Sequence, residues 1–461
     1  MIKIFGRLRN YIKKSFDHIR NERLKQSLLQ AIPFWIASVL TGLIAVGYTK
    51  VFGFAESFGT GIFDWNRWLL LAQAPVFFFI AWYIINRWAP YARGSGIPQV
   101  MAAIDLAHAG EKHDLSRLLS LKVAAIKILS SLFMVAGGGV VGREGPTIQI
   151  SASIFKFVYR LIPRNWPKLA RPNMIIAGAA AGLAAAFNTP LGGIVFAVEE
   201  LSKTHISFYR TALFTGVIIA GLTAQALLGP YLYLGYPDVN NLSGYIFFII
   251  LIVAVLGGLG GSLLSRIILR IMKWKSTFTK TSYHILYLLV CALLIATLAL
   301  FVSTSVMGSG KDTMQHLLFT GDKTPSWYLF PLRFAGPMIC FTAGGSGGVF
   351  APGLSAGAAL GAVVAQWFHL QPADTNLLVL AGMVSFLTGI TRTPFTSAIL
   401  VLEMTDRHSV IFHLILAGMV AGLTSMLIDK KSFYEHLRHE YLIAFRKEGR
   451  EKNSKKAEKL F

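Results

Sequence analysis

Charged residues are scarce in this chain of 461 residues, and their scarcity decides its class. Only 14% of the residues are charged, whereas a soluble globular domain carries about a quarter. Apolar residues make up 54%, and the mean hydropathy is +0.56. The composition therefore excludes an ordinary water-soluble protein. The apolar runs are continuous rather than alternating, which also excludes a transmembrane β-barrel.

Cysteines and catalytic motifs are equally sparse. Cys291 and Cys340 both lie in apolar surroundings, so we expect neither a disulfide framework nor a metal site. No apolar span carries a His/Glu metal spacing, and there is no GxSxG elbow. The fragment Gly308-Ser309-Gly310-Lys311 is followed by Asp312 and lacks the upstream glycine of a phosphate-binding loop. These absences argue against an intramembrane enzyme, and we expect no cofactor.

Several apolar stretches are long enough to cross a bilayer as helices, which takes about 20 residues. They include Leu28–Tyr48, Leu69–Ile85, Tyr245–Leu264, Ile285–Val302 and Val410–Ile428. We therefore predict an all-α polytopic membrane protein, with an aromatic loop at Phe54–Trp68 and a basic linker at Arg266–Lys280. The first apolar stretch lacks a cleavage-like end, so no removable signal peptide is expected.

The net charge of +22 is concentrated at the two ends of the chain. The positive-inside rule then places both termini in the cytoplasm. We predict a basic lead-in helix at residues 1–27, lying on the inner surface, and a basic cytoplasmic tail at residues 442–461. Such clusters suit topology and contact with the lipid bilayer better than binding to nucleic acid, which we do not expect.

Glycine- and proline-rich breaks interrupt the apolar pattern. Gly94–Pro98 is a tight turn that opens the helical stretch Gln99–His108, which is too short to span. Asn188–Pro190 divides the small-residue stretch Ala177–Leu201 into two short helices. Irregular backbone at membrane depth survives only where it is buried in protein or lines a cavity.

The run Ala136–Pro146 places one acid, Glu144, behind a row of glycines. Its end is typical of a loop entering a helix, because proline is tolerated in a first turn. A helix start offers unpaired N–H groups and a partial positive charge, which suit an anion. Glu144 is then either a first-turn cap or a carboxylate that can leave and admit another anion.

The glycine-rich segments occur twice. Ala136–Pro146 aligns with Thr342–Pro352, sharing three glycines and the proline. Further matches pair Ala177-Gly178 with Ala381-Gly382, Thr189-Pro190 with Thr393-Pro394, and Glu199 with Glu403. Broken helices at matching places in a duplicated chain are typical of transporters with a binding site near the midplane. We predict a first half at residues 28–230 and a second half at residues 231–441.

The repeat distinguishes acids with a structural role from acids that are candidates for a functional role. Glu199 has a partner in the other half, which favours a helix-capping role for both. Glu200 aligns with Met404, and Glu144 aligns with Phe350, so the shared architecture requires neither acid. Unduplicated acids in apolar surroundings are functional candidates by default. The alternative for Glu200 is a helix-end acid facing cytoplasmic water.

Three stretches together resemble the signature motifs of the CLC chloride channel and transporter family. They are Gly94-Ser95-Gly96-Ile97-Pro98, Gly142-Arg143-Glu144-Gly145-Pro146 and Gly348-Val349-Phe350-Ala351-Pro352, and Tyr434 resembles the family's fourth anion-site residue. The match runs from about residue 28 to residue 441. It most resembles a prokaryotic-type chloride/proton antiporter without the paired cytoplasmic CBS domains of many eukaryotic members.

The resemblance implies a homodimer in the cell inner membrane, with one anion pathway per subunit and two halves of opposite orientation. It implies that the Ser95 and Tyr434 hydroxyls coordinate chloride, and that the N–H groups of Val349 and Phe350 complete the site. Glu144 would be the gating glutamate and external proton carrier. Glu200 would transfer protons on the internal side.

The resemblance leaves one close alternative, an uncoupled chloride-selective channel of the same fold. Glu200 argues for exchange, because the channel branch usually lacks an acid there. Val349 replaces the commoner isoleucine, a conservative change. Ser95 stands where nitrate-preferring members carry proline, and the fluoride-exporting branch differs at the serine and tyrosine sites, so chloride is the expected anion.

Overall fold

The computed structural model describes residues 21–108, 115–163, 166–202, 210–229, 232–321, 323 and 325–457. In chain order the α-helices are α2 (Glu22–Trp65), α3 (Leu70–Trp88), α4 (Ile97–His108), α5 (Leu121–Ala136), α6 (Glu144–Leu161), α7 (Arg171–Phe187), α8 (Pro190–Phe196), α9 (Arg210–Leu228), α10 (Ile246–Lys275), α11 (Thr281–Phe301), α12 (Lys311–Phe319), α13 (Leu329–Ala343), α14 (Phe350–Trp367), α15 (Pro372–Thr391), α16 (Pro394–Thr405), α17 (Ile411–Ser425) and α18 (Phe433–Ala457). Short 3-10 turns are η1 (Arg67–Leu69), η2 (Pro90–Ala92), η3 (Leu115–Arg117), η5 (Thr304–Val306) and η6 (His408–Val410), and η4 (Ala197–Leu201) is a π-helix.

The predicted all-α multi-pass class is confirmed. Nine helices within the described ranges are long and apolar enough to cross a membrane. Residues 1–20 and 458–461, which carry most of the predicted lead-in helix and the end of the basic tail, lie outside the described residues. The predicted boundaries between the lead-in, the two halves and the tail stay predictions.

Two expected connections are helical instead. The predicted aromatic loop at Phe54–Trp68 was wrong, because α2 continues to Trp65 and a new turn starts only after Asn66, whose side chain accepts from the Trp68 N–H. The predicted linker at Arg266–Lys280 was wrong as well, since α10 continues to Lys275. Lysine and arginine are good helix formers, so a basic stretch at the end of a span does not break it.

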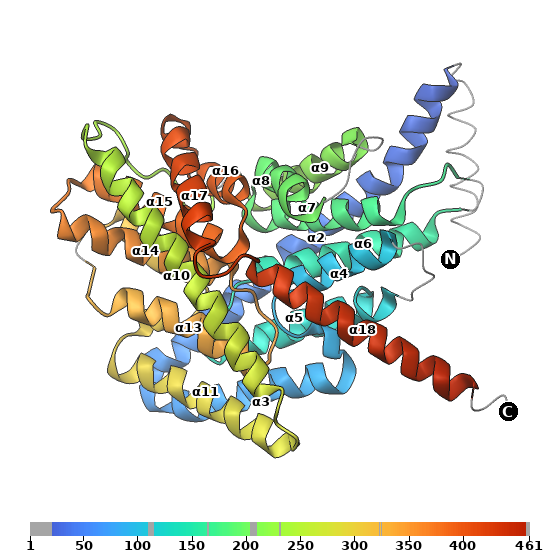
Figure 1. The fold of residues 1–461 in the computed structure, drawn as a ribbon, viewed down its shortest axis with the longest axis horizontal. Coiled ribbons are helices and arrows are strands. Elements are labelled where there is room, and N and C mark those ends of the chain that lie inside the picture. Colours follow the sequence, from blue (N-terminus) through green and yellow to red (C-terminus); the bar gives the residue numbers. More distant parts are fainter. Residues whose placement is uncertain are drawn as a thin grey trace.

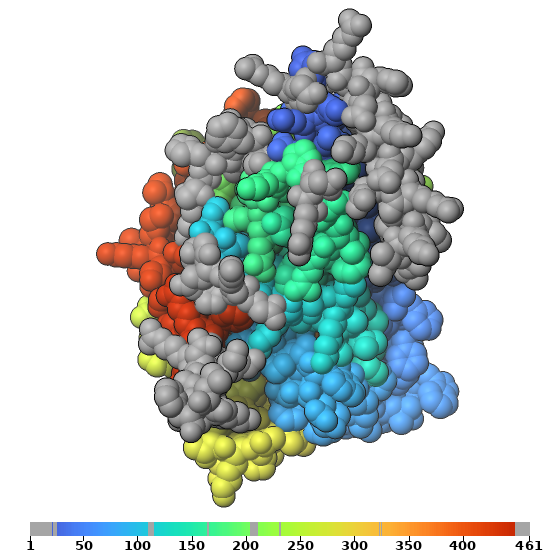
Figure 2. Space-filling model, turned by 90° about the vertical axis from the view of Figure 1, so that its right-hand side faces the viewer, coloured from blue at the N-terminus to red at the C-terminus, as the bar shows by residue number. Residues whose placement is uncertain are grey.

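Helices α4 to α9 and helices α13 to α17 lie on different sides of the molecule, and α18 crosses between them (Figure 1). The last helix returns from the second half to pack against α4 of the first. Figure 2 shows this red C-terminal helix beside first-half residues in cyan. The chain thereby brings its end back to the first broken helix.

Small residues let the central helices approach closely in both halves. A Cβ atom on Gly178 of α7 would lie 2.9 Å from the Cα atom of Ala152 in α6. In the second half, a Cβ atom on Gly357 of α14 would overlap the carbonyl oxygen of Gly382 in α15. Small side chains at helix contacts are the usual basis of close packing in membranes. The pairs α6–α7 and α14–α15 therefore form corresponding cores.

The helix breaks also correspond. α7 ends at Asn188 with a left-handed φ of 58°, and α15 ends at Arg392 with a φ of 63°. The next helix begins with Pro190 in the first half and with Pro394 in the second. Proline fits a first turn because the missing N–H has no partner there in any case. The predicted break at Asn188–Pro190 is confirmed.

Candidate functional site

Three glycine-rich loops from both halves are joined by backbone hydrogen bonds. The Gly94 N–H donates to the Gly345 carbonyl at 2.9 Å, and the Gly347 N–H donates to the Gly94 carbonyl at 3.2 Å. Gly142 and Gly348 exchange two bonds, at 2.8 and 2.9 Å, as an antiparallel bridge. These two glycines are equivalent in the sequence repeat, and an antiparallel contact between equivalent residues is what a twofold relation between halves produces.

Glycine is required in the Gly94–Pro98 turn. Gly94 has a φ of 68° and Gly96 a φ of 112°, both in the region that side chains disfavour. A Cβ atom on Gly96 would also lie 2.6 Å from the Gly145 carbonyl oxygen. The turn therefore seats the start of α4 directly against the start of α6, with Pro98 in the first turn of α4.

Two equivalent helix starts at this junction have no side-chain cap. Arg143 occupies the N-cap position of α6 and Val349 that of α14, and neither cap side chain accepts a hydrogen bond. Val349 and Phe350 are both buried. The first N–H groups of a helix have no partner within it. Those of α14 are consequently suited to an anion.

Two buried hydroxyl groups, those of Ser95 and Tyr434, lie at this junction of the glycine-rich loops. Ser95 is 1% exposed and Tyr434 is fully buried. Their side chains are neighbours, and neither hydroxyl oxygen has a partner meeting hydrogen-bond geometry among the described residues. A buried polar group without a partner costs free energy, so these hydroxyls fit a ligand with acceptor capacity.

The Tyr434 ring is positioned by α18. The preceding Phe433 packs edge-on against Phe341, with ring centroids 5.3 Å apart. Further along α18, the Tyr441 hydroxyl accepts from the Gln99 side-chain amide at 3.1 Å. These contacts fix the helix against α13 and α4, and they hold the phenol beside Ser95.

Glu144 is the first residue of α6 and is fully buried. Both carboxyl oxygens lack a partner meeting hydrogen-bond geometry in the described part of the chain, although the N–H groups of Glu144 and Ala351 lie near them. The Arg143 guanidinium lies over the Tyr233 ring at 5.9 Å. Burying a carboxylate without well-formed hydrogen bonds is costly while the group is ionised.

Glu200 lies in the π-helix η4 and is only 9% exposed. It interacts electrostatically with Tyr434, as Glu144 also does. Glu200 lies near the end of this π-helix, and its burial distinguishes it from a freely exposed acid. The structure brings Ser95, Glu144 and Tyr434 together at the glycine loops, and Glu200 within electrostatic range.

The duplicated acids cap helices, as predicted, and they do so across the two halves. Glu199 accepts from the N–H groups of Phe395 and Thr396 at the start of α16. Glu403 accepts from the N–H groups of Leu191 and Gly192 at the start of α8. Each half thus supplies the cap for the other.

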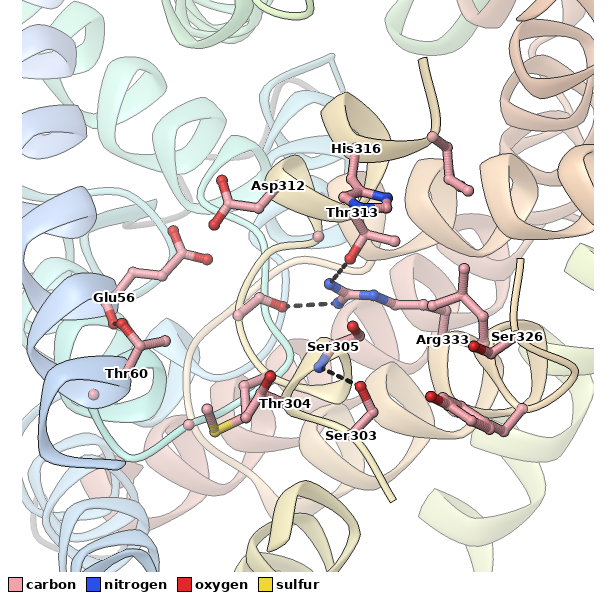
Figure 3. A pocket seen from close by; sticks show the side chains of 18 of the residues that line it. Glu56, Thr60, Ser303, Thr304, Ser305, Asp312, Thr313, His316, Ser326 and Arg333 are labelled. Carbon is pink, nitrogen blue, oxygen red and sulfur yellow. Dashed lines mark hydrogen bonds between the residues drawn. The ribbon is translucent and has the colours of Figure 1, made fainter. Parts of the chain in front are cut away.

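A cavity of about 440 Å³ with a mixed polar and apolar lining lies beside the segment that leads to Glu144. It is lined from α2, α5, η5, α12 and α13, with Gly138 in its wall. Figure 3 shows Arg333 extending into it, with Glu56 on the opposite side. The Arg333 guanidinium donates to the Thr313 hydroxyl at 2.7 Å and to the Gly308 carbonyl at 3.3 Å. The glycine segment therefore borders a cavity that contains charged and hydroxyl side chains.

Sequence reasoning missed two lysines that hold the loops. Lys127 is fully buried and donates to the carbonyls of Ala92 and Gly94, at 2.8 and 2.9 Å. Lys275 donates to Thr342 and to the next carbonyl, just before the second-half glycines. For Lys127, a charge within an apolar run was the available signal, whereas Lys275 lies among other basic residues and gave none. Among the described residues no cluster of His, Cys, Asp or Glu suits a metal ion.

Comparison with known proteins gives one consistent result. The sequence profile of the family described as voltage gated chloride channel matches residues 77–426. The chain is 28% identical over 423 residues to the H(+)/Cl(-) exchange transporter ClcA of Cronobacter sakazakii, covering 87% of each chain. Among solved structures, it is similar to a slow cyanobacterial Cl-/H+ antiporter, with a TM-score of 0.78 and 22% identity over 90% of this chain and 98% of that one. A CLC-type fluoride/proton antiporter gives a TM-score of 0.70 at 22% identity, over 89% and 98% of the two chains.

Proposed function

The chain belongs to the voltage-gated chloride channel (CLC) family, and we propose that it exchanges chloride for protons across a cell inner membrane as a secondary active antiporter. One observation carries the proposal. Two buried hydroxyls and an uncapped helix start meet at loops shared by both halves, while two buried acids belong to one half alone. The names of relatives such as the ClcA exchange transporter support the same activity.

Chloride would bind between the Ser95 and Tyr434 hydroxyls and the N–H groups of Val349 and Phe350. These groups donate hydrogen bonds and carry no full charge. They can hold an anion without trapping it, which transport requires. The duplicated glycines and prolines, with Ala351 and Gly145, shape the backbone around this site.

Glu144 would gate the site from the outer side. Under the predicted topology α2 starts in the cytoplasm, so the cavity near its far end opens outward. The ionised carboxylate would occupy an anion position. After taking up a proton it would no longer compete for that position, and it would swing aside to admit chloride.

Glu200 would exchange protons with the cytoplasm and pass them toward Glu144. Its electrostatic interaction with Tyr434 supports this assignment. Protons would move in one direction across the membrane as chloride moves in the other. The transported partners are therefore chloride and protons, with no resident cofactor.

We also propose that the transporter is a homodimer, as the family resemblance implies. Large apolar side chains on α9 and α17, including Leu222 and Phe412, are exposed in the single chain. Mass measurement in native detergent micelles tests this assignment. A mass of two chains at low protein concentration supports it, and a mass of one chain contradicts it.

Parallel flux measurement tests the antiport proposal against an uncoupled channel. Purified protein is reconstituted in liposomes loaded with chloride, and chloride and pH are recorded together. We expect proton movement in fixed proportion to chloride movement, and slower transport of nitrate and fluoride. Chloride flux with no accompanying proton flux would establish the channel instead.

A further inference from the structure

The capping glutamates form a symmetric exchange between the halves. The Glu199 carboxylate accepts from the Phe395 N–H at 3.2 Å, from the Thr396 N–H at 2.7 Å and from the Thr396 hydroxyl at 2.7 Å. The Glu403 carboxylate accepts from two N–H groups of α8, at 3.0 and 2.6 Å. Carboxylates at helix starts make charge-assisted bonds and complement the helix dipole. Both caps are therefore firm anchors.

The residue after each anchor differs in chemistry, and so does the local backbone. Glu403 lies in the regular helix α16, and the residue after it is the buried Met404. Glu199 lies in the π-helix η4, and the residue after it is Glu200. The two anchors have the same spacing from the proline that starts each helix. The wider turn is thus a local departure, of the kind that recurs at functional sites.

We propose that Glu199 is the positioning residue for Glu200. This proposal rests on the proposed proton-transfer role of Glu200. The bonds from Glu199 to α16 fix one side of the π-turn, so that the adjacent carboxyl group faces the interior near Tyr434. The proton-carrying side chain of the first half is in this way held by a helix of the second half.

The repeat supplies a matched control. Glu199→Gln and Glu403→Gln each weaken one interhalf cap, but only the first lies beside an acid. In parallel flux measurements, we expect Glu199→Gln to slow proton flux about tenfold, the scale of one lost charge-assisted hydrogen bond, with chloride flux changed by less than about twofold. Glu403→Gln should leave the proton-to-chloride ratio at the wild-type value. An unchanged ratio in Glu199→Gln, or equal changes in both variants, would overturn the proposal.

A second variant separates positioning from direct proton transfer by Glu199. Thr396→Val keeps the carboxylate and removes only the hydroxyl that binds it. We expect a smaller shift of the same ratio, about threefold, because one neutral donor is lost. If the ratio shifts in Glu199→Gln and not in Thr396→Val, Glu199 itself carries protons and the positioning role is wrong.

Failure of the proposed function gives a different pattern. Wild-type protein without proton flux would remove the antiport proposal and the positioning role together. A coupled wild type whose ratio survives Glu199→Gln would remove the positioning role alone. Elution as a single species in detergent verifies that each variant is folded before its fluxes are compared.

Discussion

The first half and the second half share a backbone and differ in chemistry. Gly142 and Gly348 are equivalent residues that bond to each other, and the helices that follow them both start without a side-chain cap. Two residues beyond these glycines, the first half has Glu144 where the second has Phe350. Duplication therefore accounts for the loops and helix starts, and divergence accounts for the acids.

The same contrast recurs in the broken helices α8 and α16. Each begins with proline and receives its cap from the other half. The segment that follows α8 carries Glu200 in the π-helix η4. At the equivalent position, α16 carries Met404 in a regular helix. The shared parts concern the backbone, and the parts found once are titratable side chains. The comparison can be tested by altering one half at a time.

Glu144→Ala should have the largest effect. Without the carboxylate nothing carries the proton at the outer gate, so we expect proton coupling to be abolished while chloride still passes. Parallel chloride and pH recording in liposomes measures both. The equivalent second-half variant, Phe350→Leu, should keep coupling. Coupled transport in Glu144→Ala would remove that residue from its assigned role.

Glu200→Gln should come next. An amide cannot exchange a proton, so we expect proton flux to fall by at least about tenfold, as when a positioned proton-transfer group is removed. Chloride flux should fall less. The same flux assay applies, with Met404→Leu as the control that keeps the wild-type ratio. Equal losses of both fluxes in Glu200→Gln would indicate a purely structural acid.

Lys127→Met should weaken chloride binding more than the corresponding change in the second half. It removes the donor to the Ala92 and Gly94 carbonyls, next to Ser95. We expect chloride affinity to drop several-fold, since each lost hydrogen bond contributes about 0.5–1.5 kcal/mol. Titration calorimetry with chloride measures the affinity. Lys275→Met serves as the control, and an equal loss there would mean that the two lysines act only through stability.

Tyr434→Phe should have the smallest effect of the series. It removes one neutral donor, which contributes about 0.5–1.5 kcal/mol, so chloride affinity should weaken about two- to tenfold. The proton-to-chloride ratio should stay near that of the wild type. Tyr441→Phe, on the same helix, removes a hydroxyl that only helps to position α18, so it should weaken affinity less than Tyr434→Phe does. Unchanged affinity in Tyr434→Phe would remove the phenol from the site.

Much of the fold and the site could be predicted from the sequence, because glycine and proline constrain the local backbone. The helix breaks at Gly94–Pro98 and Asn188–Pro190 could be predicted for this reason. The loops expected at Phe54–Trp68 and Arg266–Lys280 were wrong, since aromatic and basic residues do not end a helix. Lys127 was missed because its partners are backbone carbonyls, which a sequence does not display. The exchange of caps by Glu199 and Glu403 needed the tertiary contact between α8 and α16.

The most direct test compares wild type and Glu144→Ala in liposomes with an outward chloride gradient and no initial pH difference. Antiport predicts that chloride leaving the wild-type liposomes drives protons inward, against the pH gradient that builds up, and that Glu144→Ala releases chloride with no proton uptake. Proton uptake of equal size in both proteins, or in neither, would contradict the claim that an acid found only in the first half couples the two ions.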